Sequence, residues 1–217
     1  MNRRRVHIEC IVEGTGERFA VPALIRRWLA AKQQWASQCW TWHISSIVTH
    51  GCSRLKTGYD PGRKLGIEYY IDIARSKGAH GILVLVDADD DLPCELAPAL
   101  EARSRVAARG IPVSVAVANR EFEAWFIADR WSMRRRGTFQ PDHRFHPPLT
   151  AEGRRDCKSL VTELLGYPYS AVGHQLWLAE QLSFNRGSRR RSPSFKKLLK
   201  RLWFITREAR RYAFTHS

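Results

Sequence analysis

Acidic residues follow three of the β-strands that the sequence predicts, at the points where those strands end. They are Glu13 and Glu17 after the run 8–12, Asp87, Asp89, Asp90 and Asp91 after the run 81–86, and Glu121 and Glu123 after the run 112–118. Open α/β sheets place their ligands outside the carboxyl ends of the strands, so we expect these carboxylates to converge. Converging carboxylates repel one another unless cations bind between them. The spacing therefore predicts a metal site at that edge of the sheet.

The pair Asp87 and Asp89 is the strongest metal-ligand candidate, because residues i and i+2 of a turn can both bend toward one ion. Oxygen ligands of this kind suit Mg2+ or Mn2+, and Mg2+ bound in this way keeps several waters and accepts phosphate oxygens. Asp91 can also reach the ion, whereas Asp90 is expected to face solvent or to cap the next helix. The structural alternative is that these acids cap the helix that starts near Leu92, although one acid is enough for that purpose.

The other two acidic groups each offer one primary ligand. Glu13 follows the first strand directly, and Glu17 either shares its helix face or stabilises the helix start through the helix dipole. Glu121 is nearer to the strand end than Glu123, and residues two apart in a helix point to different sides, so we expect Glu121 to be the ligand. Glu17 and Glu123 are expected to orient the ligands rather than to bind the ion, and the alternative for Glu123 is an ion pair with an arginine.

Carboxylates that hold two metal ions can polarise a phosphodiester, generate hydroxide and stabilise the leaving oxygen. The glycine-rich segment 49–64 carries Lys56, Arg63 and Lys64, and cations there can stabilise transition-state charge. We expect Lys56 to act in the reaction and Arg63 and Lys64 to contact nucleic acid, with a solvated basic loop as the alternative for each. The residues expected to carry the reaction are Glu13, Asp87, Asp89, Glu121 and Lys56.

The chain is strongly basic, which favours a partner rich in phosphate. Its 217 residues include 36 Lys and Arg against 21 Asp and Glu, giving a formal charge of +15. Nucleic acid is the simplest such partner, and a merely soluble basic surface is the alternative. The tail 185–217 adds candidate phosphate contacts, namely Arg189, Arg190, Arg191, Lys196 and Lys197. Apolar residues recur between them at helical spacing, and we expect Phe195, Leu199 and Trp203 to lie in the core.

Hydrophobic runs and turn residues predict a regular alternation of strands and helices. The strands are predicted over 6–12, 41–48, 82–86 and 113–118, and the helices over 17–34, 65–76, 93–109 and 121–131. This order implies right-handed crossovers and a Rossmann-like α/β fold with a mostly parallel, four-stranded sheet. We expect an α/β domain over residues 1–132, a linker or insertion over 133–149, and a helical, basic C-terminal extension over 150–217.

Other chemistries lack the residue patterns that they need. The five cysteines are odd in number and lack CxxC spacing, and no HExxH pattern is present, so neither a disulfide framework nor a zinc site is expected. No GxSxG or Cys–His arrangement indicates a covalent nucleophile. Gly14 and Gly16 can bring the backbone near a phosphate but do not complete a nucleotide-binding motif. No apolar run is long enough for a membrane span, and the N-terminal run is too short and acidic for a signal peptide, so a cytoplasmic location is expected.

Three motifs resemble the bacterial DUF4276 family. They are Ile11-Val12-Glu13-Gly14-Thr15-Gly16-Glu17, Leu85-Val86-Asp87-Ala88-Asp89-Asp90-Asp91 and Arg120-Glu121-Phe122-Glu123-Ala124-Trp125-Phe126. The segments 167–175 and 191–195 resemble the C-terminal part of that family, but Ser170-Ala171 stands where a Ser-Lys pair is expected, so no role is assigned to a lysine there.

The DUF4276 family is similar to TOPRIM domains, which carry a glutamate after the first strand and Asp-x-Asp after a later one. Those domains bind Mg2+ in topoisomerases, primases and overcoming-lysogenization-defect nucleases. The resemblance implies a TOPRIM-like fold with Glu13, Asp87 and Asp89 as the metal ligands. It also implies work beside an ATPase partner in anti-phage defence.

These observations together predict a Mg2+-dependent nuclease that cleaves phosphodiester bonds of DNA or RNA. The alternative from another class is a non-catalytic nucleic-acid-binding or regulatory subunit of an ATPase complex, whose acids bind a structural ion. A third hypothesis is a phosphotransferase or a nucleotide-cleaving toxin. Metal-dependent turnover separates the first two, and assays with free nucleotides test the third.

Overall fold

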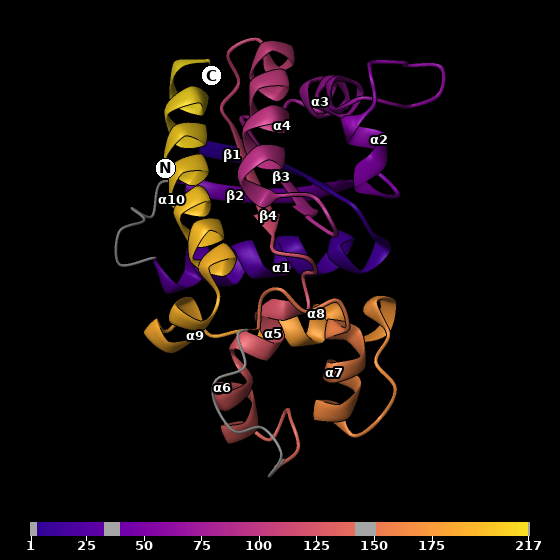
Figure 1. Ribbon diagram of the computed structural model, residues 1–217. Helices are drawn as coiled ribbons and strands as arrows, with labels where there is room; N and C mark the ends of the chain where they lie inside the picture. Colours follow the sequence, from indigo (N-terminus) through magenta and orange to yellow (C-terminus); the bar gives the residue numbers. More distant parts are fainter. Residues whose placement is uncertain (1–3, 33–39, 142–150, 217) are drawn as a thin grey trace.

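In the part of the chain that the structure describes, four parallel strands form one sheet. Figure 1 shows the helices that surround this sheet. The structure is a computed structural model that describes residues 4–32, 40–141 and 151–216. The strands are β1 (Arg4–Val12), β2 (Trp40–Val48), β3 (Gly81–Asp87) and β4 (Val113–Ala118), in the spatial order β2-β1-β3-β4. Each neighbouring pair is parallel, so all four carboxyl ends lie at the same edge of the sheet. The predicted α/β class with a four-stranded parallel sheet is confirmed.

One face of the sheet packs against α1 (Thr15–Ala31) and α10 (Pro193–Thr215). Side chains alternate along a strand, and Ile8 is among those that point to this face, where they are fully buried. On β3, Gly81 allows α10 to approach closely, because a Cβ there would lie 2.7 Å from the Cβ of Ala209. The residues expected to form a C-terminal extension therefore share a hydrophobic core with the sheet.

The opposite face packs against α3 (Ile67–Ser76) and α4 (Pro93–Ala108), with α2 (Cys52–Lys56) beside them. Ile11 and Ile82 are among the strand residues that point to this side. Both faces of the two central strands are thus covered by helices. This explains why the strand sequences are continuous apolar runs rather than alternating patterns.

The remaining helices form a lobe that lies below the sheet in Figure 1. They are α5 (Ala124–Ala128), α6 (Arg130–Arg135), α7 (Cys157–Leu165), α8 (Ala171–Gln181) and α9 (Arg186–Arg191). The lobe is joined to the sheet by α8, which packs along α1. A Cβ on Gly16 would lie 2.7 Å from the carbonyl oxygen of Ala171. The close approach that the sequence suggested for a phosphate at Gly16 is therefore made by α8.

A proline inside α1 links this helix to the edge strand β2. Pro22 has no N–H, so the carbonyl of Arg18 loses its usual partner one turn later in the helix. The hydroxyl of Ser46 on β2 donates a hydrogen bond to that carbonyl at 2.7 Å. The position of α1 on the sheet is thus fixed by a polar contact as well as by apolar packing.

Several elements differ from the sequence prediction. The helix α2 lies inside the segment 49–64, which was expected to be a loop. The helix expected over 121–131 begins only at Ala124 and is interrupted at Asp129, whose buried carboxylate accepts hydrogen bonds from Ser183 and Ser188. The helix α6 then extends into the predicted linker 133–149. Residues 142–149 of that linker, and residues 33 and 34 of the first predicted helix, lie outside the described residues.

Two further expectations concern thiols and membranes. The described cysteines, which are Cys10, Cys52, Cys94 and Cys157, are all free thiols, and Cys39 lies outside the described residues. Within the described ranges, no helix combines the length and the apolar character that crossing a bilayer requires.

Candidate active site

Glu13, the residue that follows β1, joins three elements through its carboxylate. Its Oε1 accepts the backbone N–H of Asp87 at 2.6 Å, and its Oε2 accepts the backbone N–H of Cys52 at 2.9 Å. Burial raises the pKa of Glu13 to about 7, and the charges of Glu17 and Asp89 add to this effect against the two backbone hydrogen bonds. Glu13 therefore takes up a proton or a cation more readily than an exposed glutamate does.

Asp87, the last residue of β3, lies where the negative charges of the site meet. Burial raises its pKa well above the ordinary value, and the charges of Glu17, Glu123 and Glu13 raise it further. The strand order reverses between β1 and β3, and open parallel sheets bind ligands at such a point. The structure thus brings the acids that follow the first and fourth predicted strands close to Asp87, which ends the third.

Glu17 closes the first turn of α1. Its Oε2 accepts the backbone N–H groups of Glu13 and Gly14, each at 2.9 Å, which satisfies donors at the helix start. Only 8% of Glu17 is exposed. Burial raises its pKa, the two backbone bonds oppose that rise, and the charge of Glu123 adds to it. Glu17 thus stabilises the helix start, as one of the two roles considered from the sequence predicted, and adds negative charge to the site; Glu13 precedes α1, so the two residues do not share a helix face.

Glu123 lies deeper in the site than Glu121. It is 1% exposed, and its Oε1 accepts the hydroxyl proton of Tyr169 at 2.9 Å. Burial and the charge of Glu123 raise the pKa of Glu121, whereas Lys158 lowers it. Both glutamates precede α5 instead of lying in it, so the helical argument that separated them does not apply. Both side chains can therefore face the site from one turn.

The loop 88–91 turns its other acids toward cations at the rim. Asp91 forms an ion pair with Lys56, with 2.6 Å between Oδ2 and Nζ. Asp90 pairs with Arg120 at 3.2 Å and with Arg155 at 2.8 Å. The loop is held in place because the backbone N–H of Asp89 donates to the Arg120 carbonyl at 3.1 Å.

Asp89 is exposed and has a positive φ of 47°, a left-handed conformation that suits a tight turn. Its charge raises the pKa of Glu13 and of Glu121, so it belongs to the same electrostatic site. Of the acids between residues 87 and 91, Asp87 and Asp89 thus belong to the carboxylate site. Asp90 and Asp91 instead organise basic residues around the opening.

The sequence did not point to Lys158 or Tyr169. Lys158 lies on α7; burial disfavours its charge, but the attraction of Glu123, Glu121, Asp87 and Glu17 raises its pKa. Burial and the charge of Glu123 likewise raise the pKa of Tyr169. Both residues belong to the C-terminal half and approach the site only because the lobe folds against the sheet. Neither lies in a motif with a recognisable chemical spacing.

The site's fit to a divalent cation can be judged from its donors. Carboxylate oxygens suit Mg2+ and Mn2+, and the acids are close enough to raise one another's pKa. Within residues 4–32, 40–141 and 151–216, no three His, Cys, Asp or Glu side chains already lie in an arrangement that would hold an ion. The carboxylate ligands therefore suit a divalent cation, and their side chains must turn toward a common point before they bind it.

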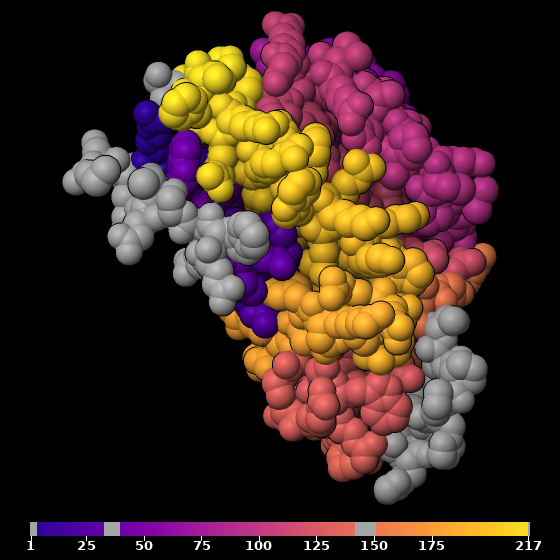
Figure 2. Space-filling view, turned by 90° about the vertical axis from the view of Figure 1, so that its left-hand side faces the viewer, coloured from indigo at the N-terminus to yellow at the C-terminus, as the bar shows by residue number. Residues whose placement is uncertain are grey.

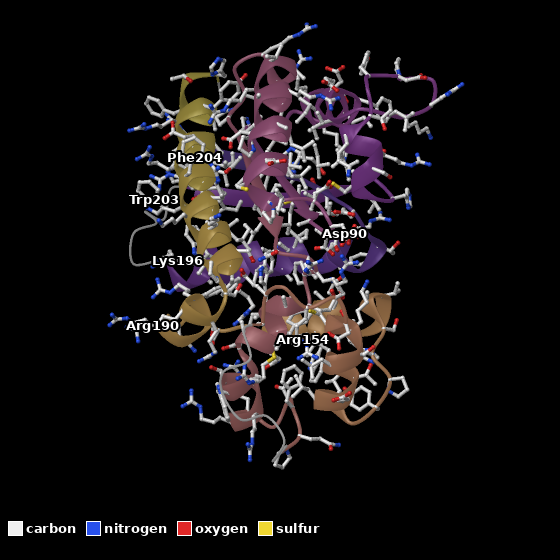
Figure 3. The ribbon with its side chains drawn as sticks, viewed as in Figure 1. Asp90, Arg154, Arg190, Lys196, Trp203 and Phe204 are labelled. Atoms are coloured by element: carbon white, nitrogen blue, oxygen red, sulfur yellow. The ribbon has the colours of Figure 1, made fainter. Side chains whose placement is uncertain are left out.

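The predicted nucleic-acid contacts lie in two places. Arg63 and Lys64 are exposed in the loop before α3, and Arg63 lies 3.7 Å from Asp60. Arg189, Arg190, Lys196 and Lys197 are exposed on α9 and α10. The Nε of Arg191 donates to the Ala128 carbonyl at 2.6 Å, so this residue has a structural contact. Figure 3 places Arg190 and Lys196 on the opposite side of the view from Asp90, so the tail and the carboxylates are not brought together.

The predicted core residues of the tail are not all buried. Phe195 is buried as predicted, and Leu199 packs partly buried against the core. The prediction for Trp203 is wrong, because 55% of this residue is exposed. Leu202 takes the core position, and the next residue of a helix points about 100° away from it. Trp203 therefore lies on the outer surface of α10.

A family model described as "Domain of unknown function (DUF4276)" matches residues 12–203. This range includes the carboxylates, the rim cations and the first 11 of the 23 residues of α10, so the chain belongs to that family. The search of curated proteins and the search of solved structures found no match.

Proposed function

We propose that this member of the DUF4276 family is a Mg2+-dependent phosphodiesterase that cleaves DNA or RNA. The observation that carries the proposal is the meeting of Glu13, Asp87 and Glu123 after three neighbouring strands, where burial and like charge raise the pKa of the first two. Carboxylates that are gathered in this way, and whose charge Lys158 offsets only in part, are typical of sites that hold a cation or a proton. Their place at the strand-order reversal supports a ligand site rather than a purely structural cluster.

Asp87, Glu13 and Asp89 are the residues that would hold Mg2+ or Mn2+, with Glu121 as a further ligand. A bound ion of this kind supplies an activated water and polarises the scissile phosphate. Tyr169 fixes the Glu123 carboxylate by its hydrogen bond, and Glu123 keeps the site negative beside Asp87. Asp91 is bonded to Lys56, so we now assign it to the rim and not to the ion.

Basic side chains at the rim support a phosphate substrate. Lys56, Arg120 and Arg155 surround the loop 88–91, and Asp90 holds both arginines in place. A phosphodiester that approaches the carboxylates meets these cations, which offset the repulsion between substrate and acids. Lys158 lies closer in and can neutralise charge that develops on a phosphoryl oxygen.

The competing function is a non-catalytic subunit, and one observation favours it. Both oxygens of Glu13 and one oxygen of Glu17 accept backbone N–H groups, which is a structural use of these carboxylates.

A TOPRIM-like relationship, an ATPase partner in anti-phage defence and a cytoplasmic location remain part of the proposal. The first two are supported by the sequence resemblance alone, and the location by the signal-peptide and membrane-span patterns of the sequence.

The decisive experiment is a cleavage assay with the purified chain. Supercoiled plasmid, single-stranded DNA, RNA and free nucleotides are each incubated with Mg2+, Mn2+ or EDTA. We expect Asp87→Asn to lower metal-dependent cleavage by at least about 100-fold while the protein stays folded. The matched control is Asp72→Asn, an aspartate of α3 that is bonded to Arg75 and lies on the helix surface.

The outcomes separate the competing functions. Cleavage that persists in EDTA or in Asp87→Asn would contradict the metal site. A protein that binds nucleic acid but cleaves none of the substrates would support the regulatory-subunit hypothesis. Turnover of free nucleotides alone would support the phosphotransferase or toxin hypothesis.

A further inference from the structure

A groove lies between α10, the end of α1 and the start of β2. It consists of a hollow of about 550 Å³ and a second of about 330 Å³, and the two are adjacent because Arg207 and Arg210 line both. We call this surface the α10 groove. Its principal lining residues are Trp28, Trp40, Trp203, Arg207, Arg210 and Phe214. Figure 2 shows α10, in yellow, exposed on this side of the molecule.

Aromatic rings and arginines alternate along the α10 groove. The guanidinium of Arg207 lies 4.5 Å from the Trp203 ring centroid, and that of Arg210 lies 5.5 Å from the Trp40 centroid. Arg4 lies 4.4 Å from the Phe214 centroid. Trp203 and Phe214 nevertheless remain 55% and 61% exposed. Large rings with this exposure offer stacking surfaces, and the cations beside them offer contacts for phosphate.

The charge of the α10 groove selects for a polyanion. Arg4, Lys32, Arg207, Arg210 and Arg211 lie along it. Glu208 contacts two of them, Arg207 at 2.7 Å and Arg211 at 3.2 Å. The remaining positive charge disfavours a second copy of this chain as the occupant, because the chain itself carries a formal charge of +15.

The α10 groove lies far from the carboxylates. Arg4 and Trp40 begin β1 and β2, whereas Glu13 follows the other end of β1. With a rise of about 3.3 Å per strand residue, Arg4 at this end of the groove and Glu13 are roughly 30 Å apart. A small ligand bound in the α10 groove therefore cannot also contact the candidate active site. A polymer is needed to reach both.

We propose that the α10 groove binds single-stranded nucleic acid, with unpaired bases stacked on Trp203 and Phe214 and phosphates held by Arg207, Arg210 and Arg211. We specify a single strand because an aromatic ring in the groove can stack only on a base whose face is free. In a duplex, the base faces are already stacked on neighbouring bases. The inference deepens the proposed function, on which the choice of nucleic acid rests. It adds a second contact that retains the substrate while the carboxylates act.

The test measures binding by the full-length protein in EDTA, which suppresses metal-dependent cleavage. Fluorescence anisotropy follows labelled oligo-dT, the same length of unstructured RNA, and duplex DNA. We expect the wild-type chain to bind the single strands more tightly than the duplex, and Trp203→Ala to weaken single-strand binding about tenfold. Trp203→Phe keeps a stacking ring and should restore most of the affinity. Arg210→Gln should weaken binding and reduce its salt dependence.

Matched controls lie elsewhere on the surface. Trp131 is 38% exposed on α6, and Arg130 lies 5.2 Å from its ring centroid, so Trp131→Ala removes a similar pair outside the α10 groove. Arg105→Gln on α4 is the charge control. Equal loss in Trp131→Ala and Trp203→Ala, unchanged affinity in Trp203→Ala, or preference for duplex each overturns the proposal.

The two proposals fail in different ways. If Trp203→Ala binds like the wild type while Asp87→Asn has lost cleavage, the α10 groove is wrong and the enzymatic function stands. If Trp203→Ala loses affinity while Asp87→Asn cleaves normally, the α10 groove stands and the carboxylate site is wrong. Melting temperatures of every variant separate lost contacts from lost folding.

Discussion

The side-chain carboxylate of Glu13 accepts a hydrogen bond from the backbone N–H of Asp87, with 2.6 Å between the Glu13 Oε1 and the Asp87 nitrogen. Glu13 follows β1 and Asp87 ends β3, so the bond joins the two strands between which the order of the sheet reverses. It attaches one carboxylate to the main chain of the other acid. Their charges therefore stay together, and the site responds to protons and cations as one unit.

Mg2+ is expected to stabilise the protein against heat, and more at about pH 8 than at about pH 5.5. Burial raises the pKa of Glu13 from 4.5 to about 7, so the folded metal-free state holds a proton that the unfolded chain releases. This stabilising contribution is present below the unfolded pKa and is lost as the pH rises through about 7. A divalent cation then replaces the proton. Each kcal/mol by which bound Mg2+ stabilises the folded protein raises Tm by about 2–4 °C in a chain of this size.

Thermal unfolding at several pH values, with and without Mg2+, checks this expectation. KCl at matched ionic strength controls for screening of surface charge. A shift that KCl reproduces, or one that is larger at low pH, would show that the carboxylates do not bind the ion.

Lys158→Met is expected to tighten Mg2+ binding while lowering the stability of the metal-free protein. The ammonium of Lys158 is attracted by Glu123, Glu121 and Asp87, so it neutralises part of the charge that a cation would use. Its removal should strengthen Mg2+ binding about fivefold, which corresponds to about 1 kcal/mol for a pair near the surface. Isothermal titration calorimetry measures the affinity, with Lys200→Met of α10 as the control. Weaker binding in Lys158→Met would instead assign the lysine a supporting role for the ion's ligands.

Glu9→Gln is expected to destabilise the fold by about 1–3 kcal/mol, because it breaks a buried charged network. Glu9 is fully buried and accepts hydrogen bonds from Ser45 at 2.6 Å and from Lys77 at 3.2 Å, with His7 at 3.1 Å. Burial opposes the charge, yet His7, Ser45 and Lys77 together lower the pKa of Glu9 below its ordinary value.

The pH dependence of Glu9 has the opposite sign from that of Glu13. Its stabilising contribution is present above the unfolded pKa of 4.5 and is lost as the pH falls through the lower folded value. Urea unfolding of Glu9→Gln and wild type from about pH 7 down to about pH 3 measures the difference. Glu95→Gln on the exposed first turn of α4 is the control. A gap between Glu9→Gln and wild type that does not narrow on acidification would contradict the prediction.

Gly16→Ala and Gly173→Ala are expected to change stability in opposite directions. At Gly16 a Cβ would lie 2.7 Å from the Ala171 carbonyl oxygen, so α8 must move, at a cost of about 1–3 kcal/mol. At Gly173, inside α8, the nearest atoms are 3.9 Å away, and alanine favours a helix over glycine by about 1 kcal/mol. Chemical denaturation of both variants provides the comparison. Similar changes in the two would mean that α8 does not depend on a close contact with α1.

The sheet and its acidic edge were predictable because both follow from local sequence. Ile82 to Val86 form an uninterrupted apolar run, which is typical of a strand covered on both faces, and Asp87 closes it. Glu13 could be placed in the same way, since parallel strands end at one edge. The relative depth of Glu121 and Glu123 could not, because it depends on where α5 starts.

The residues that the C-terminal half adds to the candidate active site could not be predicted from the sequence. Lys158 and Tyr169 approach the carboxylates through packing of α7 and α8 on distant elements, and no local pattern encodes such contacts. The exposure of Trp203 was missed because two adjacent residues, Leu202 and Trp203, are both large and apolar. Periodicity indicates that one face of α10 is buried, but it does not decide between neighbours at the edge of that face.

The packing of α10 on the sheet affects how the chain can fold as it is made. The helix α10 covers β1, β3 and β4, yet the ribosome synthesises it after all four strands. Until it emerges, α1 covers only part of that face of the sheet, and the contacts that α10 makes with the central strands have a high sequence separation. Such a chain is expected to acquire its final core after translation of α10 and to depend on chaperones until then. Ribosome-stalled chains that end before residue 193 should accordingly be far more sensitive to protease than chains that include α10.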